Sequence, residues 1–399
     1  MEIDIDINKI DEILNRGTVV EILPTKDEFR NKLLSGEKLR LYIGFDATAP
    51  NLHLSHAKNF MFMEKLRKLG HEVIILFGDF TARIGDPTGE NATRKQLSRE
   101  DVLENVKKWI EMVKPFMDFN NKENPPIIKY NHDWLSKLSF EDIMNIASNF
   151  TVQHMISRDM FQKRIKEEKP IHLHEFLYPL MQGYDSVSMD VDAEVCGTDQ
   201  TFNALAGRML LKKMKGKEKF VVALTLMENP KTKELMSKSK GTGVFLDGKA
   251  VDMFGQIMSQ PDEMMEILFV NNTLLSLDEI KEILNQNDPK KSKLLLAFEI
   301  TKIYHGKDLA IEAQKIWEAT FSNKEIPESV EHTLELDETK SLMDIAIESG
   351  LVSSKTDYRR LLDTNSIEHM DTETIIKDDK HPSQIGTYRI GKKRFFRIK

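Results

Sequence analysis

The chain has 399 residues, of which 40% are hydrophobic and 30% charged, and a formal net charge of −7, so its length fits roughly two to four globular domains. Its single cysteine, Cys196, excludes a disulfide framework and a zinc site built from several cysteines, so no zinc is expected. No run of about 18 apolar residues occurs, and the acidic first residues lack the layout of a signal peptide, so a cytoplasmic protein with no membrane partner is expected.

The first 250 residues alternate predicted strands with predicted helices. In chain order we expect a polar helix and linker at 1–35, a strand at 41–45, a loop at 46–51, a helix ending at Leu69, a strand at 73–77, a helix at 100–117, a strand at 191–195 and a helix at 201–214. Strand, helix and strand between 41 and 77 form a parallel βαβ unit. This alternation predicts a doubly wound α/β domain that binds ligands at the carboxyl ends of its strands.

Beyond residue 250 the pattern changes to consecutive helices and then to a small mixed segment. We expect helices at 252–269, 277–285, 290–305, 308–320, 341–349 and 354–362, and a short β-rich end at 387–398. The sequence therefore predicts three domains, at 1–248, 249–326 and 335–399.

Two stretches are basic although the whole chain is acidic. Arg208 to Lys240 holds ten basic and three acidic residues, and Lys380 to Lys399 holds seven basic residues and no acidic one. Such runs are more often solvated faces than binding surfaces. Because phosphate contacts are local, an RNA partner nevertheless stays open.

Two histidines, His53 and His56, follow the first predicted strand at the start of the next helix. Helix N-termini carry free N–H groups and partial positive charge, which attract phosphate. Both side chains lie on one face there, where both can donate to a polyphosphate. Taken alone, the pattern is more often surface polarity than a site, and no further metal ligand is close in sequence.

A small basic loop at residues 235–241, with the sequence LMSKSKG, is the second candidate element. Its Lys238 is suited to stabilise the charge that develops on a pyrophosphate, where electrostatic catalysis gains most. By itself, a loop of lysine and serine is more often only a loop.

Together and in this order, the histidine pair and the basic loop resemble the two signature motifs of class I aminoacyl-tRNA synthetases. The resemblance covers nearly the whole chain and is strongest to the bacterial tyrosyl-tRNA synthetases. The further matching stretches are YIGFDAT at 42–48, GDFTARIGDPTG at 78–89, YPLMQGYD at 178–185 and GTDQ at 197–200. It implies a Rossmann-like, doubly wound parallel-sheet catalytic domain, followed by an all-α anticodon-binding domain and a small α+β RNA-binding domain.

The resemblance implies a tyrosine–tRNA ligase. Such an enzyme activates L-tyrosine with ATP to tyrosyl-adenylate and pyrophosphate, and then transfers tyrosine to the 3′ end of tRNA(Tyr). Magnesium would accompany ATP as a phosphate-bound ion, so no metal ligands of the protein are expected. A homodimer is also implied.

Tyr178, Gln182 and Asp185 are spaced i, i+4, i+7, which puts them on one face of a helix. A solvated polar face is the alternative. By resemblance, Tyr42 and Asp185 bond the substrate hydroxyl, and phenylalanine would leave this buried pair unsatisfied. The implied tyrosine-binding residues are Tyr42, Asp86, Tyr178, Gln182, Asp185 and Gln200.

The nucleotide-binding residues follow from the same resemblance. The implied ATP-binding residues are Gly44, Asp46, His53, His56, Asp199 and Lys238. The residues implied to assist catalysis are Thr48, His53, His56, Lys238 and Ser239. The chemistry would be an in-line adenylyl transfer driven by positioning and charge stabilisation.

Four residues depart from the family pattern. Ser55 replaces the glycine between the histidines, Leu235 replaces the first lysine of the loop, and Cys196 replaces the first of two glycines before Thr198. Glu194 stands where some members have glutamine and others an acid. We expect these changes to affect rate rather than fold.

The segment from Ser341 to Arg360 resembles the small alpha-L RNA-binding domain. Lys355, Arg359 and Arg360 are implied to contact RNA phosphates, with a solvated helix face as the alternative. The match is partial, because an arginine near Ser341 and a glycine near Asn365 are missing.

Two alternative functions stay open. A synthetase for a related amino acid such as tryptophan is disfavoured by Tyr42 and Asp185. A catalytically inactive, synthetase-derived RNA-binding protein is suggested by the departures at Ser55, Leu235 and Cys196, but the retained histidines, Lys238 and Asp199 argue against it.

Overall fold

The structure is a computed structural model that describes residues 2–86, 97–236, 242–286, 288–322, 332–334, 336–337, 339–372, 374–391 and 394–399. The chain divides into two compact units, Met1–Ala310 and Ile311–Lys399. Among the described residues, no helix is both long enough and apolar enough to cross a membrane.

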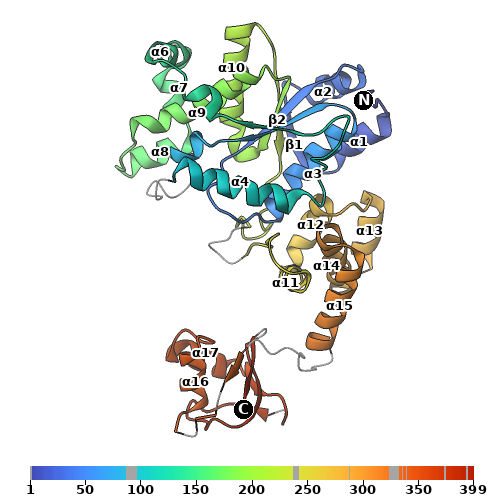
Figure 1. Cartoon of the computed structure of the whole chain (residues 1–399), viewed down its shortest axis with the longest axis vertical. Coiled ribbons are helices and arrows are strands. Elements are labelled where there is room, and N and C mark those ends of the chain that lie inside the picture. The colour runs from blue at the N-terminus through green and yellow to red at the C-terminus, as the bar shows by residue number, and fades with distance from the viewer. Residues whose placement is uncertain are drawn as a thin grey trace. The chain divides into compact units, whose positions relative to one another are not determined.

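A six-stranded sheet forms the centre of the first unit, in the order β1-β6-β5-β2-β3-β4 (Figure 1). The strands are β1 (Val19–Leu23), β2 (Arg40–Phe45), β3 (Glu72–Phe77), β4 (Ile127–Tyr130), β5 (Ala193–Gly197) and β6 (Phe220–Leu224). All neighbours are parallel except β1, which runs antiparallel to β6 at the edge. The apolar runs of β3 and β6 are buried, as expected for strands covered on both faces.

The chain leaves the middle of this sheet in two directions. Helix α3 (Leu54–Lys68) connects β2 to β3 on one side, and α10 (Thr201–Lys215) connects β5 to β6 on the other. Since such crossovers are right-handed, the two helices cover opposite faces of the sheet. The direction switches between β2 and β5, and a crevice forms at their carboxyl ends.

The remaining helices of the α/β part lie around this sheet. They are α1 (Ile7–Asn15), α2 (Lys26–Leu34), α4 (Arg99–Val113), α5 (His132–Leu135), α6 (Phe140–Ala147), α7 (Val152–Ile156), α8 (Asp159–Lys166) and α9 (Leu173–Met189). Helix α9 packs along α10. Its Leu180 and Val187 share a buried cluster with Leu210 and Leu211.

A group of helices follows the last strand of the large sheet. These are α11 (Ala250–Met258), α12 (Met265–Asn272), α13 (Leu277–Asn285), α14 (Pro289–His305) and α15 (Lys307–Ser322). The single helix predicted at 252–269 was wrong. The chain breaks after Met258, because Pro261 cannot continue a helix, and a 3-10 turn at Asp262–Met264 precedes α12.

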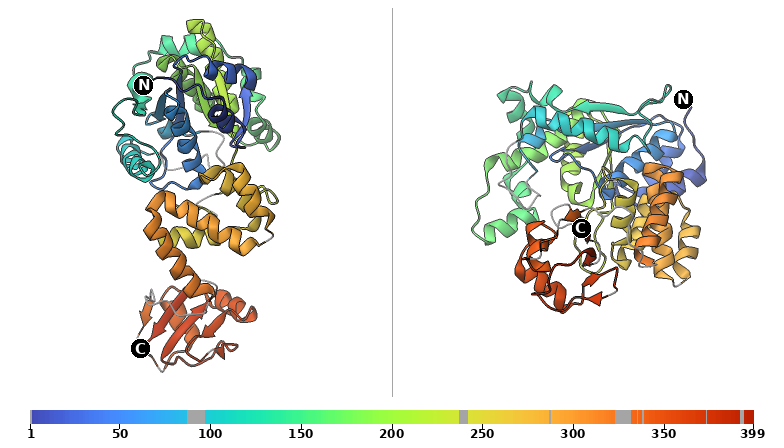
Figure 2. Two further views of the ribbon diagram at one scale, coloured as in Figure 1. Left: turned by 90° about the vertical axis from the view of Figure 1, so that its right-hand side faces the viewer. Right: turned by 60° about the horizontal axis from the view of Figure 1, so that its bottom comes forward.

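The second unit contains a five-stranded sheet in the order β7-β11-β10-β8-β9, whose strands run side by side in Figure 2. Its elements are β7 (His332–Leu334), α16 (Leu342–Glu348), α17 (Lys355–Asp363), β8 (Ile367–His369), β9 (Thr374–Ile375), β10 (Gly386–Ile390) and β11 (Arg394–Ile398). Its own core includes Tyr358, Tyr388 and Phe396. Asn365 takes a left-handed φ of 50°, so it fills the conformation for which the sequence lacks a glycine.

Other predicted boundaries need correction. The segment 1–35 contains strand β1 between two helices, which a polar-helix prediction missed. Helix α4 ends at Val113 rather than at 117, since Pro115 follows. Strand β5 covers Ala193–Gly197, two residues later than predicted, because its ladder with β6 extends to Gly197.

Candidate functional site

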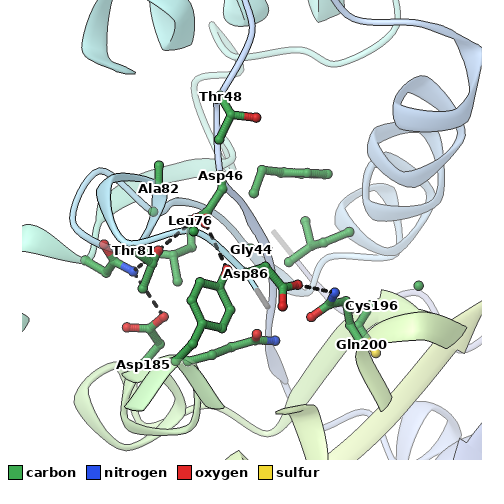
Figure 3. Close-up of a pocket in the computed structure, with 18 of the residues that line it drawn as sticks. Gly44, Asp46, Thr48, Leu76, Thr81, Ala82, Asp86, Asp185, Cys196 and Gln200 are labelled. Atoms are coloured by element: carbon green, nitrogen blue, oxygen red, sulfur yellow. Dashed lines mark hydrogen bonds between the residues drawn. The ribbon is translucent and has the colours of Figure 1, made fainter. Parts of the chain in front are cut away.

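A cleft of about 1130 Å³ opens at the carboxyl ends of β2 and β5, at the switch point of the sheet (Figure 3). It brings together residues that are up to 184 positions apart, from Tyr42 to Leu226. The predicted site residues that line it are Tyr42, Gly44, Asp46, Thr48, His56, Asp86, Tyr178, Gln182, Asp185, Asp199 and Gln200. Lys238 and Ser239 lie outside the described residues.

Asp46 directly follows β2 and is held by two hydroxyl donors. Thr81 Oγ1 donates to Asp46 Oδ1 at 2.7 Å, and the Tyr178 hydroxyl donates to Asp46 Oδ2 at 2.8 Å (Figure 3). A Cβ on Gly78 would lie 2.0 Å from Asp46 Oδ1, so this approach requires glycine. Burial raises the pKa of Asp46 to about 7, against the lowering effect of both hydrogen bonds.

Asp185 is buried on α9 and accepts from two side-chain N–H groups. Trp134 Nε1 donates to Asp185 Oδ1 at 2.8 Å, and Asn131 Nδ2 donates to Asp185 Oδ2 at 3.4 Å. Burial raises the pKa of Asp185 well above its ordinary value. Tyr42 lines the same cleft from β2, but its hydroxyl is hydrogen-bonded to Ser186 Oγ at 3.0 Å.

A chain of amide side chains joins α9 to the turn that follows β5. Asn203 Nδ2 donates to Gln182 Oε1 at 3.0 Å and to Gln200 Oε1 at 2.8 Å. Gln200 Nε2 donates to Asp86 Oδ2 at 2.7 Å, as drawn in Figure 3, and to Asp199 Oδ2 at 3.2 Å. Asn203 therefore fixes the orientation of both glutamine amides, because it donates to the side-chain oxygen of each.

The predicted helix face exists on α9. Its first turn is capped by the reciprocal contacts of His172 and Glu175, and it continues through Pro179 to Met189. Tyr178, Gln182 and Asp185 all line the cleft from this helix. This excludes the alternative that the three residues form a solvated face.

The two histidines stand at the start of α3, where His53 is the N-cap residue. Their ring centroids are 4.1 Å apart. Burial lowers the pKa of His53 to about 4 and that of His56 to about 3, so both imidazoles are neutral at pH 7. His56 lines the cleft, whereas His53 lies beside it, and its buried Nδ1 has no hydrogen-bond partner among the residues that the structure describes.

The described residues that follow the basic loop are paired with the start of α3. Leu54 N donates to Val244 O at 3.0 Å, and Leu246 N donates to Leu52 O at 3.0 Å. Phe245 forms a backbone bridge with His53. The chain therefore returns from the loop directly beside the histidines.

The four departures from the family pattern have distinct surroundings. Ser55 and the buried free thiol of Cys196 line the cleft. Burial raises the pKa of Cys196, which keeps the thiol protonated. Leu235 is 48% exposed, and Glu194 is buried in an ion pair with Lys219.

Sequence reasoning missed several polar residues of the cleft. Lys58 is buried and lines the cleft, where its ammonium donates to Asn59 Oδ1 at 2.7 Å. Burial lowers the pKa of Lys58 to about 7. Lysines and asparagines are usually exposed, so the only sequence sign that Lys58 and Asn59 belong to the cleft is their position two and three residues after His56. No feature of the sequence indicated Asn131 or Trp134.

The three basic residues predicted to contact RNA lie on or at the start of α17 with exposed side chains. Lys355 Nζ is 3.8 Å from Asp344 Oδ1, Arg359 Nε is 2.8 Å from Asp379 Oδ2, and Arg360 Nη2 is 2.8 Å from Asp357 Oδ1. Exposed pairs of this kind contribute little to stability and exchange readily with other anions. Within the described ranges, no three His, Cys, Asp or Glu residues are grouped to hold a metal ion.

Comparison with known proteins links this chain to one family. A sequence model of the class I tRNA synthetases (W and Y) matches residues 34–322. The chain is 36% identical to a tyrosine–tRNA ligase of Thermotoga maritima, over 97% of this chain and 96% of that protein. It is 38% identical to one of Nitratidesulfovibrio vulgaris, over 99% of each.

Solved structures show the same fold. A C-terminally truncated mitochondrial tyrosyl-tRNA synthetase of Aspergillus nidulans superposes with a TM-score of 0.67 and 21% identity, over 78% of this chain and 94% of that one. A tyrosyl-tRNA synthetase of Archaeoglobus fulgidus complexed with L-tyrosine gives a TM-score of 0.59 and 17% identity, over 77% of this chain and all of that one.

Proposed function

Because the chain belongs to the class I tRNA synthetases of the tryptophan and tyrosine family, we propose that its cleft carries out the tyrosine–tRNA ligase reaction with the residues described above. The chain is an ATP-dependent aminoacyl-tRNA ligase, and tyrosine–tRNA ligases match it over nearly its whole length. Its substrates are L-tyrosine, ATP and tRNA(Tyr). The observation that carries the assignment of the cleft is that Tyr42 of β2 and Tyr178 and Asp185 of α9 all line it.

Tyrosine binds with its two polar ends against different groups. Tyr178, Gln182, Asp86 and Gln200 surround the α-ammonium group, with Asp46 adding negative charge through its bond to Tyr178. Tyr42 and Asp185 contact the phenol hydroxyl at the other end. A ligand without that hydroxyl leaves buried polar groups unpaired, which costs about 1–3 kcal/mol for each group.

The nucleotide binds on the side of the cleft formed by α3 and the turn after β5. Asp199 holds the ribose, Gly44 and Asp46 lie on the floor, and His56 and His53 donate to the triphosphate. A carboxylate oxygen of tyrosine attacks the α-phosphorus, and the bond to the bridging oxygen of pyrophosphate breaks. Neutral imidazoles donate one N–H each as negative charge builds on the leaving group.

Thr48, Lys238 and Ser239 assist this step. The described residues that follow Lys238 in the chain lie beside His53, because Val244 and Phe245 pair with the start of α3. A lysine from this loop and the two histidines then act on the same phosphates. Magnesium enters with ATP as part of the substrate, and no zinc takes part.

The protein acts as a homodimer in the cytoplasm. Large apolar side chains are exposed between residues 140 and 173, and burial between two copies would remove them from water. These are Phe140, Met144, Val152, Ile165 and Leu173. Sedimentation should give twice the chain mass of 46.1 kDa, and Phe140→Asp with Val152→Asp should shift it to the monomer.

The parts after the catalytic domain bind tRNA. We divide the chain into a catalytic domain at 1–248, a helical anticodon-binding domain at 249–326 and an RNA-binding domain at 335–399. Lys355, Arg359 and Arg360 contact phosphates of the tRNA. Replacing all three by glutamine should weaken tRNA binding and flatten its salt dependence, while tyrosine activation stays unchanged.

Amino-acid-dependent exchange of pyrophosphate into ATP tests the activity directly. Tyrosine should support exchange, and phenylalanine and tryptophan should support it much less. Transfer of labelled tyrosine to tRNA(Tyr) tests the second step. Tryptophan-dependent exchange would favour the alternative substrate, and tRNA binding without any exchange would favour a catalytically inactive RNA-binding protein.

A further inference from the structure

A buried ion pair adjoins the cleft, and one of its two members, Glu194, lines it. Lys219, just before β6, pairs with Glu194 on β5, and their side chains are 0% and 2% exposed. Withdrawing two charges from water costs several kcal/mol for each, so a buried pair is weak grounds for a stabilising role. Its hydrogen-bond partners show what else it does.

The pair contacts both sides of the predicted tyrosine site. Lys219 Nζ donates to Ser186 Oγ at 2.8 Å, and Ser186 Oγ is 3.0 Å from the Tyr42 hydroxyl. On the other side, Gln182 Nε2 donates to Glu194 Oε1 at 3.1 Å. The ion pair is therefore one hydrogen bond away from Gln182 and two away from Tyr42.

The donors in this network fix part of its hydrogen-bond pattern. An ammonium group only donates, so Ser186 Oγ accepts from Lys219. Ser186 Oγ also lies 3.0 Å from the Tyr42 hydroxyl oxygen and 3.4 Å from Glu194 Oε2. The serine therefore links the ion pair to the phenol, whichever of the two hydroxyl groups donates in the Tyr42–Ser186 bond.

The Tyr42 hydroxyl can make a second hydrogen bond beside the one to Ser186, because a phenol oxygen carries one proton and accepts as well. Burial raises the pKa of Tyr42 well above its ordinary value, so the phenol keeps its proton. Asp185, on the same side of the cleft, offers acceptor oxygens. A substrate hydroxyl that bonds Tyr42 and donates to Asp185 matches this arrangement, whereas a hydrogen atom in its place leaves one hydrogen-bonding position of each group unfilled.

We propose that Lys219 and Glu194, acting through Ser186, are positioning residues that hold the Tyr42 hydroxyl in place for its hydrogen bond with the hydroxyl of tyrosine. This inference rests on the proposed function, because it assigns a selectivity role within the same cleft. Glu194 also accepts from Gln182, and Glu194→Gln keeps an acceptor oxygen for that bond, so the ammonium end of the site is retained in the neutral variant.

The packing around the network leaves room only for these groups. A Cβ on Gly207 of α10 would lie 2.7 Å from Lys219 Nζ and 2.8 Å from Ser186 Oγ. Gly207→Ala therefore displaces the lysine or the serine without removing any polar group. It is a variant of the network that leaves every site residue in place.

The test compares tyrosine-dependent with phenylalanine-dependent pyrophosphate exchange in Ser186→Ala, in the neutral double variant Lys219→Met with Glu194→Gln, and in Gly207→Ala. Loss of one oriented hydrogen bond should lower kcat/KM for tyrosine by roughly tenfold. The kcat/KM for phenylalanine and the KM for ATP should stay within about twofold of the unaltered protein. The ratio of the two kcat/KM values, tyrosine over phenylalanine, should therefore fall by as much as the tyrosine value does.

A second buried ion pair, Arg67 with Glu64 on α3, supplies the matched control. Arg67→Met with Glu64→Gln removes a pair of similar burial away from the cleft, and it should leave the tyrosine-to-phenylalanine ratio unchanged. An equal loss for both amino acids in the Ser186 and Lys219 variants, or no loss for either, would overturn the inference. Absence of tyrosine-dependent exchange in the unaltered protein would instead remove the proposed function, and this inference with it.

Discussion

The two sides of the cleft differ in how their polar groups are satisfied. On the tyrosine side, Asp46, Asp185 and Gln182 already hold hydrogen bonds from neighbouring side chains. On the proposed nucleotide side, His53 has a buried Nδ1 without a partner in the described part of the chain, and burial keeps both imidazoles neutral by lowering their pKa values. We therefore propose that the tyrosine side is built before its ligand arrives and that an anion completes the nucleotide side.

This difference assigns distinct tasks to the two sides. A preorganised set of donors and acceptors discriminates between amino acids, because a wrong ligand leaves a fixed group unpaired. Buried, neutral imidazoles discriminate less but gain most as charge develops on the phosphates. Variants on the tyrosine side should therefore change selectivity, and variants on the nucleotide side should change rate.

The largest effect is expected at Asp185. Asp185→Ala removes the acceptor held by Trp134 and should lower kcat/KM for tyrosine by roughly 100-fold, with little effect on phenylalanine. Pyrophosphate exchange with both amino acids measures this. The isosteric Asp185→Asn is the matched control for packing. A preference for tyrosine that survives Asp185→Ala would refute the assignment of this end of the cleft.

On the nucleotide side, His56→Ala should lower kcat for exchange by roughly 100-fold and leave tyrosine binding unchanged. The imidazole lines the cleft and is neutral in the free protein. We expect it to donate a hydrogen bond to the phosphates, so it contributes nothing to tyrosine binding when ATP is absent. Steady-state exchange and tyrosine titration without ATP separate the two quantities. If weaker tyrosine binding accounted for the loss, the division between the two sides would be incorrect.

Tyrosine affinity should depend on pH near neutrality. Burial raises the pKa of Asp46 to about 7, so the carboxylate that attracts the substrate ammonium is present above pH 7 and lost below it. Affinity should fall by up to about tenfold per pH unit below pH 7. Titration between pH 5.5 and about 8 measures this, and Asp46→Asn should bind weakly with a flat profile. A flat profile in the unaltered protein would contradict this assignment of the charge.

The smallest effect concerns stability on the nucleotide side. Burial lowers the pKa of Lys58 to about 7, so below pH 7 the folded protein carries a buried charge that the unfolded chain holds in water. This penalty is complete below pH 7 and vanishes above the ordinary lysine pKa of about 10.4. Lys58→Met should raise the thermal midpoint by about 2 °C at pH 6 and by less at about pH 9.5. Equal shifts at both pH values would show that the charge is not the cause.

The sequence predicted the fold from its apolar periodicity, and it predicted the cleft from motifs that converge at the strand ends. The sequence-based predictions failed for elements whose structure depends on contacts with distant parts of the chain. Strand β1 looks like linker because it is a short edge strand whose partner, β6, lies about 200 residues later. A helix was extended across Pro261 because apolar residues continue on both sides.

The sequence predicted which residues gather in the cleft, but it did not predict how they pair. Tyr42 and Asp185 both line the cleft, yet Tyr42 is bonded to Ser186 and Asp185 to Trp134. Neither partner belongs to a motif with chemistry of its own. Lys58 and Lys219 were unpredictable for the opposite reason, because lysine is among the residues least often buried.

Equilibrium binding of tyrosine and phenylalanine to the full chain without ATP tests the central claim most directly. A tyrosine side that is built in advance should bind tyrosine at least roughly 100-fold more tightly than phenylalanine before any nucleotide is present. Equal affinity for the two amino acids, or tyrosine binding that appears only with ATP, would contradict it.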